Sequence, residues 1–247
     1  MARIKKIFFS KRHKDIKSRT LKTYGLSESA IKQKLKDVGQ RGLHFEILSH
    51  PKGVDLRIVA EGEGGKALEE MVEAVDKKIR HRLGKHIFGI NGDKMETVLG
   101  KLLVAQKKTI AVAESCTGGL LCHWLTNVPG SSEYFKQGII AYSNESKVAL
   151  LNIPEEILSR SGAVSVETVE AMAKGVRELG KAHIGLAVSG IAGPGGGTEE
   201  KPVGLVWVGL ADNAKVISEE HHFRGGRELI KIQASQAALD LVRRNLR

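Results

Sequence analysis

The spacing of hydrophobic and polar positions changes near residue 92 and divides the chain into two parts. In the first part, apolar residues recur at helical spacing in two stretches and alternate with polar residues in two others, with a glycine-rich turn before the second helical stretch. The order helix, two strands, helix is typical of a compact α+β module. The predicted elements are a helix that Ser27 can cap, two strands, a long helix and an exit strand: 27–38, 43–48, 54–60, 66–83 and 87–92.

From Asp93 onward, helical and strand patterns alternate, and several of the strands are continuous apolar runs of the kind that are buried on both faces. This part, residues 93–247, is predicted to be an α/β domain with a mixed sheet flanked by helices. The predicted helices are 95–108, 120–125, 143–151, 165–179 and 227–246, and the predicted strands are 109–112, 138–142, 183–188, 203–210 and 215–222.

The charge is as uneven as the pattern. Residues 1–100 hold 22 Lys and Arg against 13 Asp and Glu, whereas residues 101–247 hold 17 against 15. The first 22 residues contain nine of these basic side chains and one acid, so they form either a flexible arm over residues 1–17 or a solvated first strand. A basic first domain keeps nucleic acid among its candidate partners, although a solvated basic face is the commoner explanation of such an excess.

Cysteine and histidine usage gives no sign of a disulfide framework or a metal site. Cys116 and Cys122 lie six positions apart in one turn and helix, and no histidine has metal-ligand spacing with Cys, Asp or Glu. No apolar run reaches 18 residues, and the residue pattern indicates neither a membrane span nor a secretory signal. We therefore expect reduced thiols, a cytoplasmic protein with no membrane contact, and no metal or organic cofactor.

The heptapeptide AESCTGG, residues 113–119, is predicted to turn sharply from a strand into a helix. Such a turn directs hydroxyl, thiol and backbone N–H groups at one spot, which favours an anion or oxyanion site, although a plain connection is the alternative. Two further loops, 142–147 and 190–197, also follow predicted strands. The three loops should converge if these strands are parallel neighbours, because ligands bind at the carboxyl edge of such sheets.

The three loops and the loop 128–135 contain several candidate nucleophiles, and the basic side chain in a motif loop after one of the middle strands is Lys147. A hydroxyl nucleophile needs a base within hydrogen-bond reach, and Lys147 can serve if its pKa is lowered, with Tyr142 relaying the proton. A rival arrangement is a Glu114, Lys147 and Cys116 set, in which a thiolate attacks. The candidate nucleophiles are Ser115, Cys116, Ser132 and Ser143.

Two glycine-bearing loops have weaker signals. The loop 190–197 can cradle phosphate or ribose through its N–H groups, but it matches neither the P-loop nor the dinucleotide fingerprint. Arg224 and Arg227, beside the last helix, can pair with a phosphate. GQRG, residues 39–42, is a GxxG of the type found in RNA-binding KH modules, and it is equally consistent with ordinary helix capping.

Six longer motifs in this order resemble one known family, the CinA proteins, whose carboxy-terminal domain is the nicotinamide-nucleotide amidase also called PncC. Residues 18–92 are similar to the KH-like domain that precedes it, so the resemblance covers the chain from about residue 18 to its end. The resemblance implies an amidase domain over 93–247 and a smaller KH-like α+β domain over 1–92. The motifs are AESCTGG, VPGSSEYF, AYSNESK, GAVSVETVEAMAKGVRE, SGIAGPGGGTEEKPVGLVW and FRGGRE.

The resemblance also implies a reaction and roles for particular residues. The reaction is hydrolysis of nicotinamide mononucleotide to nicotinate mononucleotide and ammonia, with Ser132 as nucleophile, Tyr142 and Lys147 as its activating pair, Ser115 in support and Arg227 holding the substrate. Backbone N–H groups would stabilise the developing oxyanion. The positions expected to line the substrate are Thr117, Gly118, Gly119, Gly190, Gly193 and Gly195.

Long CinA proteins begin with a molybdopterin-binding-like domain associated with ADP-ribose pyrophosphatase activity. We expect this activity to be absent here. A homodimer is expected from the family alone. The competing hypothesis is a competence-linked nucleic-acid-binding protein that acts through residues 1–92, with the second domain as a scaffold. It predicts an affinity for RNA or single-stranded DNA that falls steeply with salt.

Overall fold

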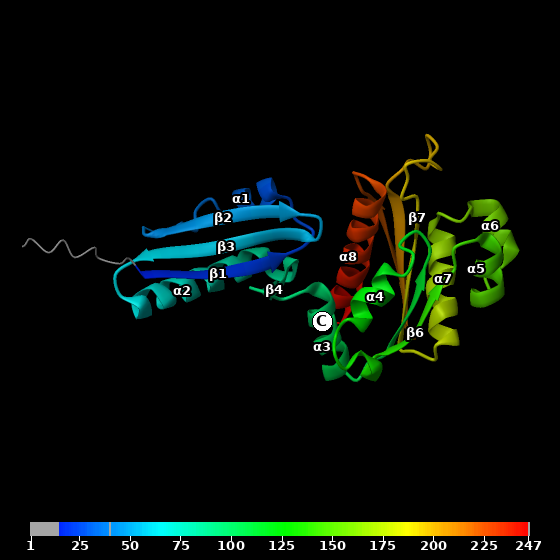
Figure 1. Cartoon of the computed structure of the whole chain (residues 1–247), viewed down its shortest axis with the longest axis horizontal. Helices are drawn as coiled ribbons and strands as arrows, with labels where there is room; N and C mark the ends of the chain where they lie inside the picture. Colours follow the sequence, from blue (N-terminus) through cyan, green and yellow to red (C-terminus); the bar gives the residue numbers. More distant parts are fainter. Residues whose placement is uncertain (1–14, 40, 247) are drawn as a thin grey trace, which may run out of the picture. The chain divides into compact units, whose positions relative to one another are not determined.

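The computed structural model describes residues 15–39 and 41–246. The chain divides into two compact units, residues 1–91 and residues 92–247 (Figure 1). Each unit has its own sheet and its own helices, and each is described by itself below.

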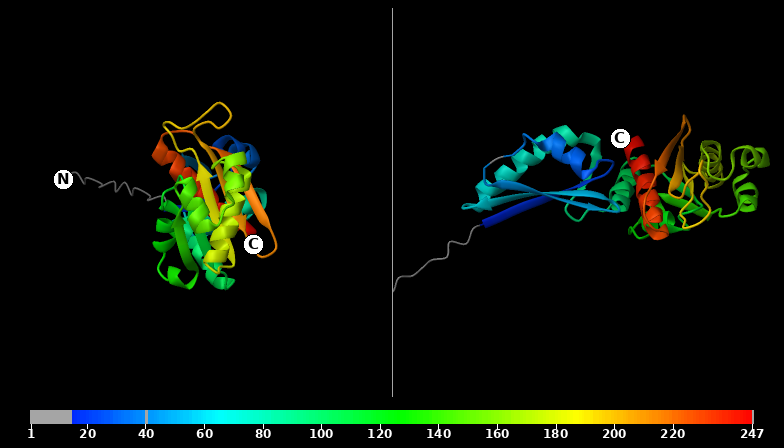
Figure 2. Two further views of the ribbon diagram at one scale, coloured as in Figure 1. Left: turned by 90° about the vertical axis from the view of Figure 1, so that its right-hand side faces the viewer. Right: turned by 90° about the horizontal axis from the view of Figure 1, so that it is seen from above.

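The first unit is a four-stranded antiparallel sheet, in the order β2-β3-β1-β4, with both of its α-helices on one face (Figure 2, right). Ser27 caps the first helix as predicted, because its hydroxyl accepts a hydrogen bond from the N–H of Ala30. The elements are β1 (Asp15–Thr23), α1 (Glu28–Leu35), β2 (Leu43–His50), β3 (Gly53–Gly62), α2 (Gly65–Leu83), the 3-10 turn η1 (Gly84–His86) and β4 (Ile87–Ile90).

The core of this unit lies between the sheet and α2. Leu21, Ile58 and Val75 are fully buried there, and the side chains that alternate with them on β2 and β3 are mostly exposed and polar. This alternation is what an antiparallel sheet with one solvated face requires.

Of the two alternatives for the basic first segment, the structure supports a strand from residue 15 onward, since residues 15–17 already pair with β3. Two of the basic side chains on this strand have carboxylate partners. Arg19 donates to Asp76 on α2 at 2.8 Å, and Lys22 donates to Asp55 on β3 at 2.6 Å. The remainder of the predicted arm, residues 1–14, lies outside the described residues.

The second unit has three layers: helices, a five-stranded sheet and helices again (Figure 1). α7 packs on one face of the sheet with α5 and α6 beside it, and α8 packs on the other face beside α3 and α4. Helix α6 has no counterpart among the predicted elements. The elements are α3 (Met95–Ala105), β5 (Ile110–Glu114), α4 (Leu120–Thr126), the 3-10 turn η2 (Ser131–Glu133), β6 (Phe135–Ile140), α5 (Asn144–Leu151), α6 (Glu155–Ser161), α7 (Val166–Leu179), β7 (Ile184–Gly190), β8 (Leu205–Ala211), β9 (Val216–His222) and α8 (Arg227–Asn245).

The sheet of the second unit is mixed, as the sequence predicts, with the order β6-β5-β7-β8-β9. β5 runs parallel to both β6 and β7, whereas β8 and β9 are antiparallel additions. All five residues of β5 are buried because helices cover both faces. The carboxyl ends of β6, β5 and β7 therefore meet at one edge, which confirms the predicted convergence of the three loops that follow them.

Among the described residues, every helix is too short or too polar to cross a lipid bilayer.

Candidate active site

The turn that follows β5 is shaped by Glu114. Gly118 and Gly119 have φ of +62° and +95°, a left-handed backbone that favours glycine, and α4 begins at once. The fully buried carboxylate of Glu114 accepts hydrogen bonds from the N–H groups of Gly119 and Cys122, both at 2.8 Å, and of Leu121 at 3.2 Å. The anion that binds the N–H groups of Gly119, Leu121 and Cys122 is therefore the protein's own side chain. The expected oxyanion site at the beginning of the turn, where Ser115 and Cys116 line the pocket, stays a prediction.

Ser115 follows Glu114 and lies beside Lys147. The Nζ atom of Lys147 is 3.3 Å from Ser115 Oγ, 3.0 Å from the carbonyl oxygen of Ala141 and 3.4 Å from that of Tyr142. Helix α5 positions this lysine, and Ser143 and Ser146 form a capping box at its start. The candidate nucleophile Ser143 is thus a cap, and the hydroxyl in contact with the lysine is that of Ser115.

Lys147 is 1% exposed, and burial lowers the pKa of its ammonium below the ordinary value of 10.5, against smaller opposing effects of Cys116 and Glu145. Its three contacts suit both protonation states. As an ammonium, Nζ donates to all three oxygens, and as an amine it donates to the two carbonyls while its lone pair accepts the hydroxyl proton of Ser115. A base that exchanges a proton with Ser115 must keep its hydrogen bonds in both its protonated and its neutral form.

Arg227, the first residue of α8, joins two of the converging loops. Its Nη1 donates to the carbonyl oxygen of Gly193 at 2.7 Å, and its Nη2 donates to the hydroxyl of Tyr142 at 2.9 Å. The Tyr142 ring is 58% exposed, and the contact of Lys147 with this residue is to its carbonyl and not to its hydroxyl. Tyr142 lines the pocket, and its expected part in a Tyr–Lys proton relay stays a prediction.

These groups surround a pocket of about 270 Å³ at the carboxyl edge of the sheet. Of the positions expected to line the substrate, Gly190, Gly193, Gly195 and Arg227 do so, whereas Thr117, Gly118 and Gly119 lie in the turn behind Ser115 and are not part of the lining. The sequence did not single out Ser189, which lines the pocket and donates to the carbonyl of Ala163 at 2.6 Å. The full lining is Ser115, Cys116, Tyr142, Lys147, Ala163, Val164, Ser189, Gly190, Ile191, Ala192, Gly193, Gly195, Gly196 and Arg227.

Ser132 lies at the amino ends of the parallel strands, at the opposite end of the sheet from the pocket. It belongs to η2, which precedes β6, and its neighbour Tyr134 accepts a hydrogen bond at 2.7 Å from the N–H of Ile110, the first residue of β5. Ser115 follows the last residue of β5, and five residues of strand span about 16 Å. Ser132 is exposed and does not line the pocket, so one chain does not bring it to Lys147.

In the rival thiol arrangement, the three residues lie close together, but the thiol is protonated and the carboxylate does not contact the lysine. Cys116 is 5% exposed, and burial raises the pKa of its thiol to about 12, which leaves it protonated near neutral pH. Glu114 accepts from the start of α4, so it does not orient Lys147. The geometry favours the hydroxyl of Ser115 over the thiol.

Within residues 15–39 and 41–246, no three His, Cys, Asp or Glu side chains gather as they would around a metal ion. The histidines that the sequence left without a role have protein partners: His183 contacts Thr109 at 2.8 Å and His123 contacts Asn127 at 3.0 Å.

The first unit has a hollow of its own, about 420 Å³, between α1 and β2. Gly39 of the GxxG lies in its lining, while Gln40 of that motif is outside the described residues. Of the two lysines in the lining, Lys32 is paired with Glu28 at 2.6 Å. Nucleic-acid binding by this unit stays a prediction.

Comparison with known protein families decides the family. The family model described as CinA C-terminal domain matches residues 92–246, and the model described as damage-inducible protein CinA KH domain matches residues 18–89. The chain belongs to the CinA family. The resemblance found in the motifs is thereby confirmed over both units.

Relatives and solved structures agree with this membership. The chain is similar to a putative competence-damage inducible protein of Moorella thermoacetica, with 45% identity over 97% of this chain and 58% of the relative, and to one of Caldicellulosiruptor bescii, with 44% identity over 94% and 57%. It thus spans less than three fifths of the length of these CinA relatives.

Two crystal structures of CinA proteins match the chain over one unit's length. A CinA superfamily protein of Klebsiella pneumoniae has a TM-score of 0.60 at 31% identity, over 62% of this chain and 95% of its own. A competence/damage inducible protein of Agrobacterium tumefaciens has 0.59 at 34%, over 62% and 96%.

Proposed function

We propose that this CinA-family chain hydrolyses the amide of nicotinamide mononucleotide, with Ser115 as nucleophile and Lys147 as general base. The reaction comes from the resemblance to the nicotinamide-nucleotide amidases. The assignment of the two residues rests on one observation: Ser115 Oγ lies 3.3 Å from the buried Nζ of Lys147 in a pocket at the carboxyl edge of the sheet.

In the first half of the reaction, Ser115 Oγ attacks the carboxamide carbon while its proton moves to Lys147 Nζ. The tetrahedral oxyanion is stabilised by backbone N–H groups, for which that of Cys116 is placed directly after the nucleophile. The C–N bond then breaks, and Lys147 returns the proton to the departing nitrogen, which leaves as ammonia. An ester between the nicotinoyl group and Ser115 remains.

In the second half, water attacks this ester and gives a proton to Lys147. The ester C–O bond breaks, Lys147 protonates Ser115 Oγ, and nicotinate mononucleotide is released. Lys147 thus accepts and donates a proton twice in one cycle. The lowered pKa supports this role, because a base is most effective when its pKa lies close to the working pH.

The assignment of Ser132 as nucleophile stays a prediction of the resemblance and competes with Ser115. Ammonia release from nicotinamide mononucleotide should be measured for the purified chain and for the Ser115→Ala and Ser132→Ala variants. We expect Ser115→Ala to lower kcat by a factor of at least about 10³, since loss of a nucleophile leaves only binding and oxyanion stabilisation, and Ser132→Ala to stay within about threefold of the unmodified chain.

The reverse result, an inactive Ser132→Ala beside an active Ser115→Ala, would overturn the dyad and require a second copy of the chain to bring Ser132 to Lys147. Absence of ammonia release from the unmodified, folded chain would overturn the reaction itself. Circular dichroism of each variant guards against loss of fold.

A further inference from the structure

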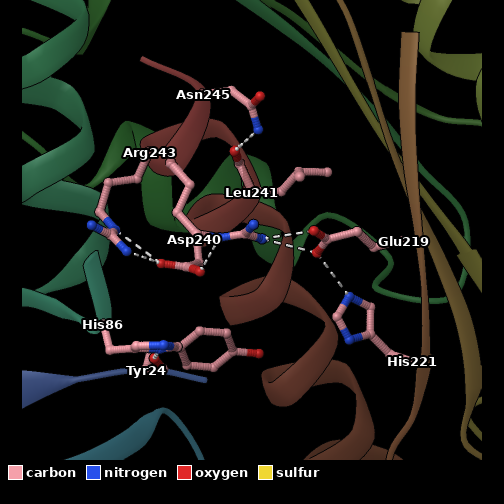
Figure 3. Close-up of polar contacts among 9 residues, drawn as sticks. Tyr24, His86, Glu219, His221, Asp240, Leu241, Arg243 and Asn245 are labelled. Carbon is pink, nitrogen blue, oxygen red and sulfur yellow. Dashed lines mark hydrogen bonds and ion pairs between the residues drawn. The ribbon is translucent and has the colours of Figure 1, made fainter. Parts of the chain in front are cut away.

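At the carboxyl end of helix α8, the carboxylate acceptors are filled by donors of the protein itself. Arg243 donates to Asp240 at 2.6 Å, and Arg244 donates to Asp240 at 2.7 Å and to Glu219 at 2.9 Å (Figure 3). The carboxylate of Glu219 also lies beside His221. A ligand would find these acceptors already occupied.

The pocket at the carboxyl edge of the sheet contains a hydroxyl in the opposite situation, that of Ser189. Ser189 is 1% exposed, and it donates its hydroxyl proton to the carbonyl oxygen of Ala163 at 2.6 Å. A hydroxyl has one proton to donate and two lone pairs that can accept. Within residues 15–39 and 41–246, no donor reaches Ser189 Oγ. The hydroxyl therefore presents only accepting capacity to the pocket that it lines.

Ser189 lies beside Ser115 on the neighbouring strand. β5 and β7 are parallel, and the N–H of Ser115 donates to the carbonyl oxygen of Val188 at 3.0 Å. One step further along β7, the side chains of Ser115 and Ser189 fall on the same face of the sheet, because side chains alternate along a strand. Neighbouring strands lie about 4.8 Å apart. A carboxamide whose carbon meets Ser115 Oγ can therefore bring its nitrogen to Ser189.

The other polar side chains of the pocket leave this accepting role open. Among the described residues that line it, there is no Asp, Glu, Asn or Gln. In the proposed reaction Ser115 gives its proton to Lys147, and the hydroxyl of Tyr142 accepts from Arg227 at 2.9 Å. Of the hydroxyls in the lining, that of Ser189 is left with lone pairs for an N–H of the substrate.

We propose that Ser189 accepts a hydrogen bond from the NH2 group of the substrate's carboxamide and so makes the site selective for a carboxamide over a carboxylate. A carboxylate has only acceptor atoms, so its oxygen would face the lone pairs of Ser189, whereas the amide donates to them. The product acid is therefore disfavoured where the substrate's amide is held. The inference rests on the proposed function for the identity of the reacting group, but the selectivity can be measured without turnover.

The first test measures this selectivity in a chain without either candidate nucleophile, the double variant Ser115→Ala/Ser132→Ala. Nicotinamide mononucleotide and nicotinate mononucleotide are each titrated into it by calorimetry, and the ratio of their dissociation constants is compared with and without Ser189→Ala. The phosphate, ribose and ring are common to both ligands and cancel in the ratio. We expect Ser189→Ala to shift the ratio about tenfold against the amide, because the amide loses a neutral hydrogen bond and the acid loses a repulsion.

Lys201→Met is the matched control for the structural role of Ser189, which also holds the pocket wall at Ala163. Lys201 Nζ donates to the carbonyl oxygen of Ser161 in the same wall at 2.7 Å, but Lys201 does not line the pocket. A displaced wall would weaken the binding of amide and acid alike, so Lys201→Met should leave the ratio within about twofold. If Ser189→Ala does not fold, Ser189→Cys, which fills the same space with a weak acceptor, should shift the ratio in the same direction.

Kinetics of the chain with both serines intact supply a second readout. The methyl ester of nicotinate mononucleotide carries the same acyl group as the amide but no N–H. Ser189→Ala should lower kcat/KM about tenfold for nicotinamide mononucleotide and leave it within about twofold for the ester, measured as release of nicotinate mononucleotide. Lys201→Met should change both values by the same factor.

An unchanged binding ratio in Ser189→Ala, or an equal shift in Lys201→Met, would overturn the selectivity, and so would an equal kinetic loss on the amide and the ester. Ammonia release beside an unchanged ratio would leave the amidase standing without Ser189 in amide recognition. A shifted ratio without ammonia release would mean that the site recognises the carboxamide and does not hydrolyse it. If neither nucleotide binds at millimolar concentration, the selectivity and the proposed substrate are both wrong.

Discussion

The two edges of the five-stranded sheet each present a serine from a motif of the same family, in very different surroundings. At the carboxyl edge, Ser115 is 8% exposed and touches a lysine that is 1% exposed. At the amino edge, Ser132 is exposed, in a single 3-10 turn. A hydroxyl becomes a nucleophile when a base within hydrogen-bond reach takes its proton. The buried lysine beside Ser115 is therefore better evidence for a reactive serine than the presence of either serine in a family motif.

The largest expected effect at the carboxyl edge comes from Lys147→Met. We expect kcat/KM to fall by about 10² to 10⁴, because the general base is lost, while the protein becomes more stable, because a buried cation with a lowered pKa is replaced by an apolar side chain. Ammonia release and thermal unfolding measure the two effects.

The gain in stability should depend on pH. The folded state holds the proton of Lys147 less tightly than the unfolded state, so the unfolding free energy of the unmodified chain rises with pH from the lowered pKa up to the ordinary 10.5. The advantage of Lys147→Met is thus greatest below the lowered pKa and disappears above 10.5. The control is Lys136→Met, near the amino end of β6, which should change neither activity nor stability. An active Lys147→Met variant would exclude Lys147 as the general base.

The second-largest expected effect is a loss of folding stability in the Glu114→Gln variant. Glu114→Gln places an amide where three N–H groups converge, so at least one charged hydrogen bond is lost and an N–H donor faces other donors. We expect a loss of about 2 to 3 kcal/mol in unfolding free energy, measured by denaturant titration.

Glu133→Gln, exposed at the amino edge, is the matched control and should cost less than about 0.5 kcal/mol. Equal effects of the two substitutions would mean that Glu114 does not hold the start of α4.

The smallest expected effects are those of removing the hydroxyl from Tyr142 or from Tyr134, and they differ in whether KM or stability changes. Tyr142→Phe removes the acceptor of Arg227 at the pocket and should raise KM two- to fivefold with the unfolding free energy unchanged. Tyr134→Phe, at the amino edge, removes a buried hydrogen bond at 3.0 Å to the carbonyl of Leu125 and should cost about 1 kcal/mol of stability with KM unchanged. If Tyr134→Phe altered KM instead, the two edges would be coupled and the contrast between them would fail.

The sequence predicted the parts of the molecule that follow from local pattern. The apolar run before AESCTGG, the capping serine at 27, the helices predicted over 143–151 and 165–179, and the switch from α+β to α/β are all present in the structure. Lys147 was found because it is the only basic group in a motif loop that follows one of the central strands.

Other features depend on contacts that no local pattern carries. The segment 15–23 lacks apolar alternation because its buried face includes Arg19, whose charge is satisfied by Asp76 from a helix 57 positions away. The sequence offered Glu114 as a member of a Glu–Lys–Cys catalytic set, and only the fold reveals that its carboxylate accepts the N–H groups at the start of α4. Ser132 is closer than Ser115 to Lys147 in the sequence. Ser132 precedes β6, however, whereas Ser115 follows β5, and Lys147 belongs to the loop and helix at the carboxyl ends of these parallel strands.

The acceptors that hold Lys147 have one consequence for how the site can vary. Two of its three partners are main-chain carbonyls, those of Ala141 and Tyr142, and they persist whatever side chains these positions carry. The Tyr142 side chain can therefore be substituted while the main-chain acceptors still hold the Lys147 ammonium in place. One residue thus contributes its side chain to the pocket wall and its carbonyl to the position of the base.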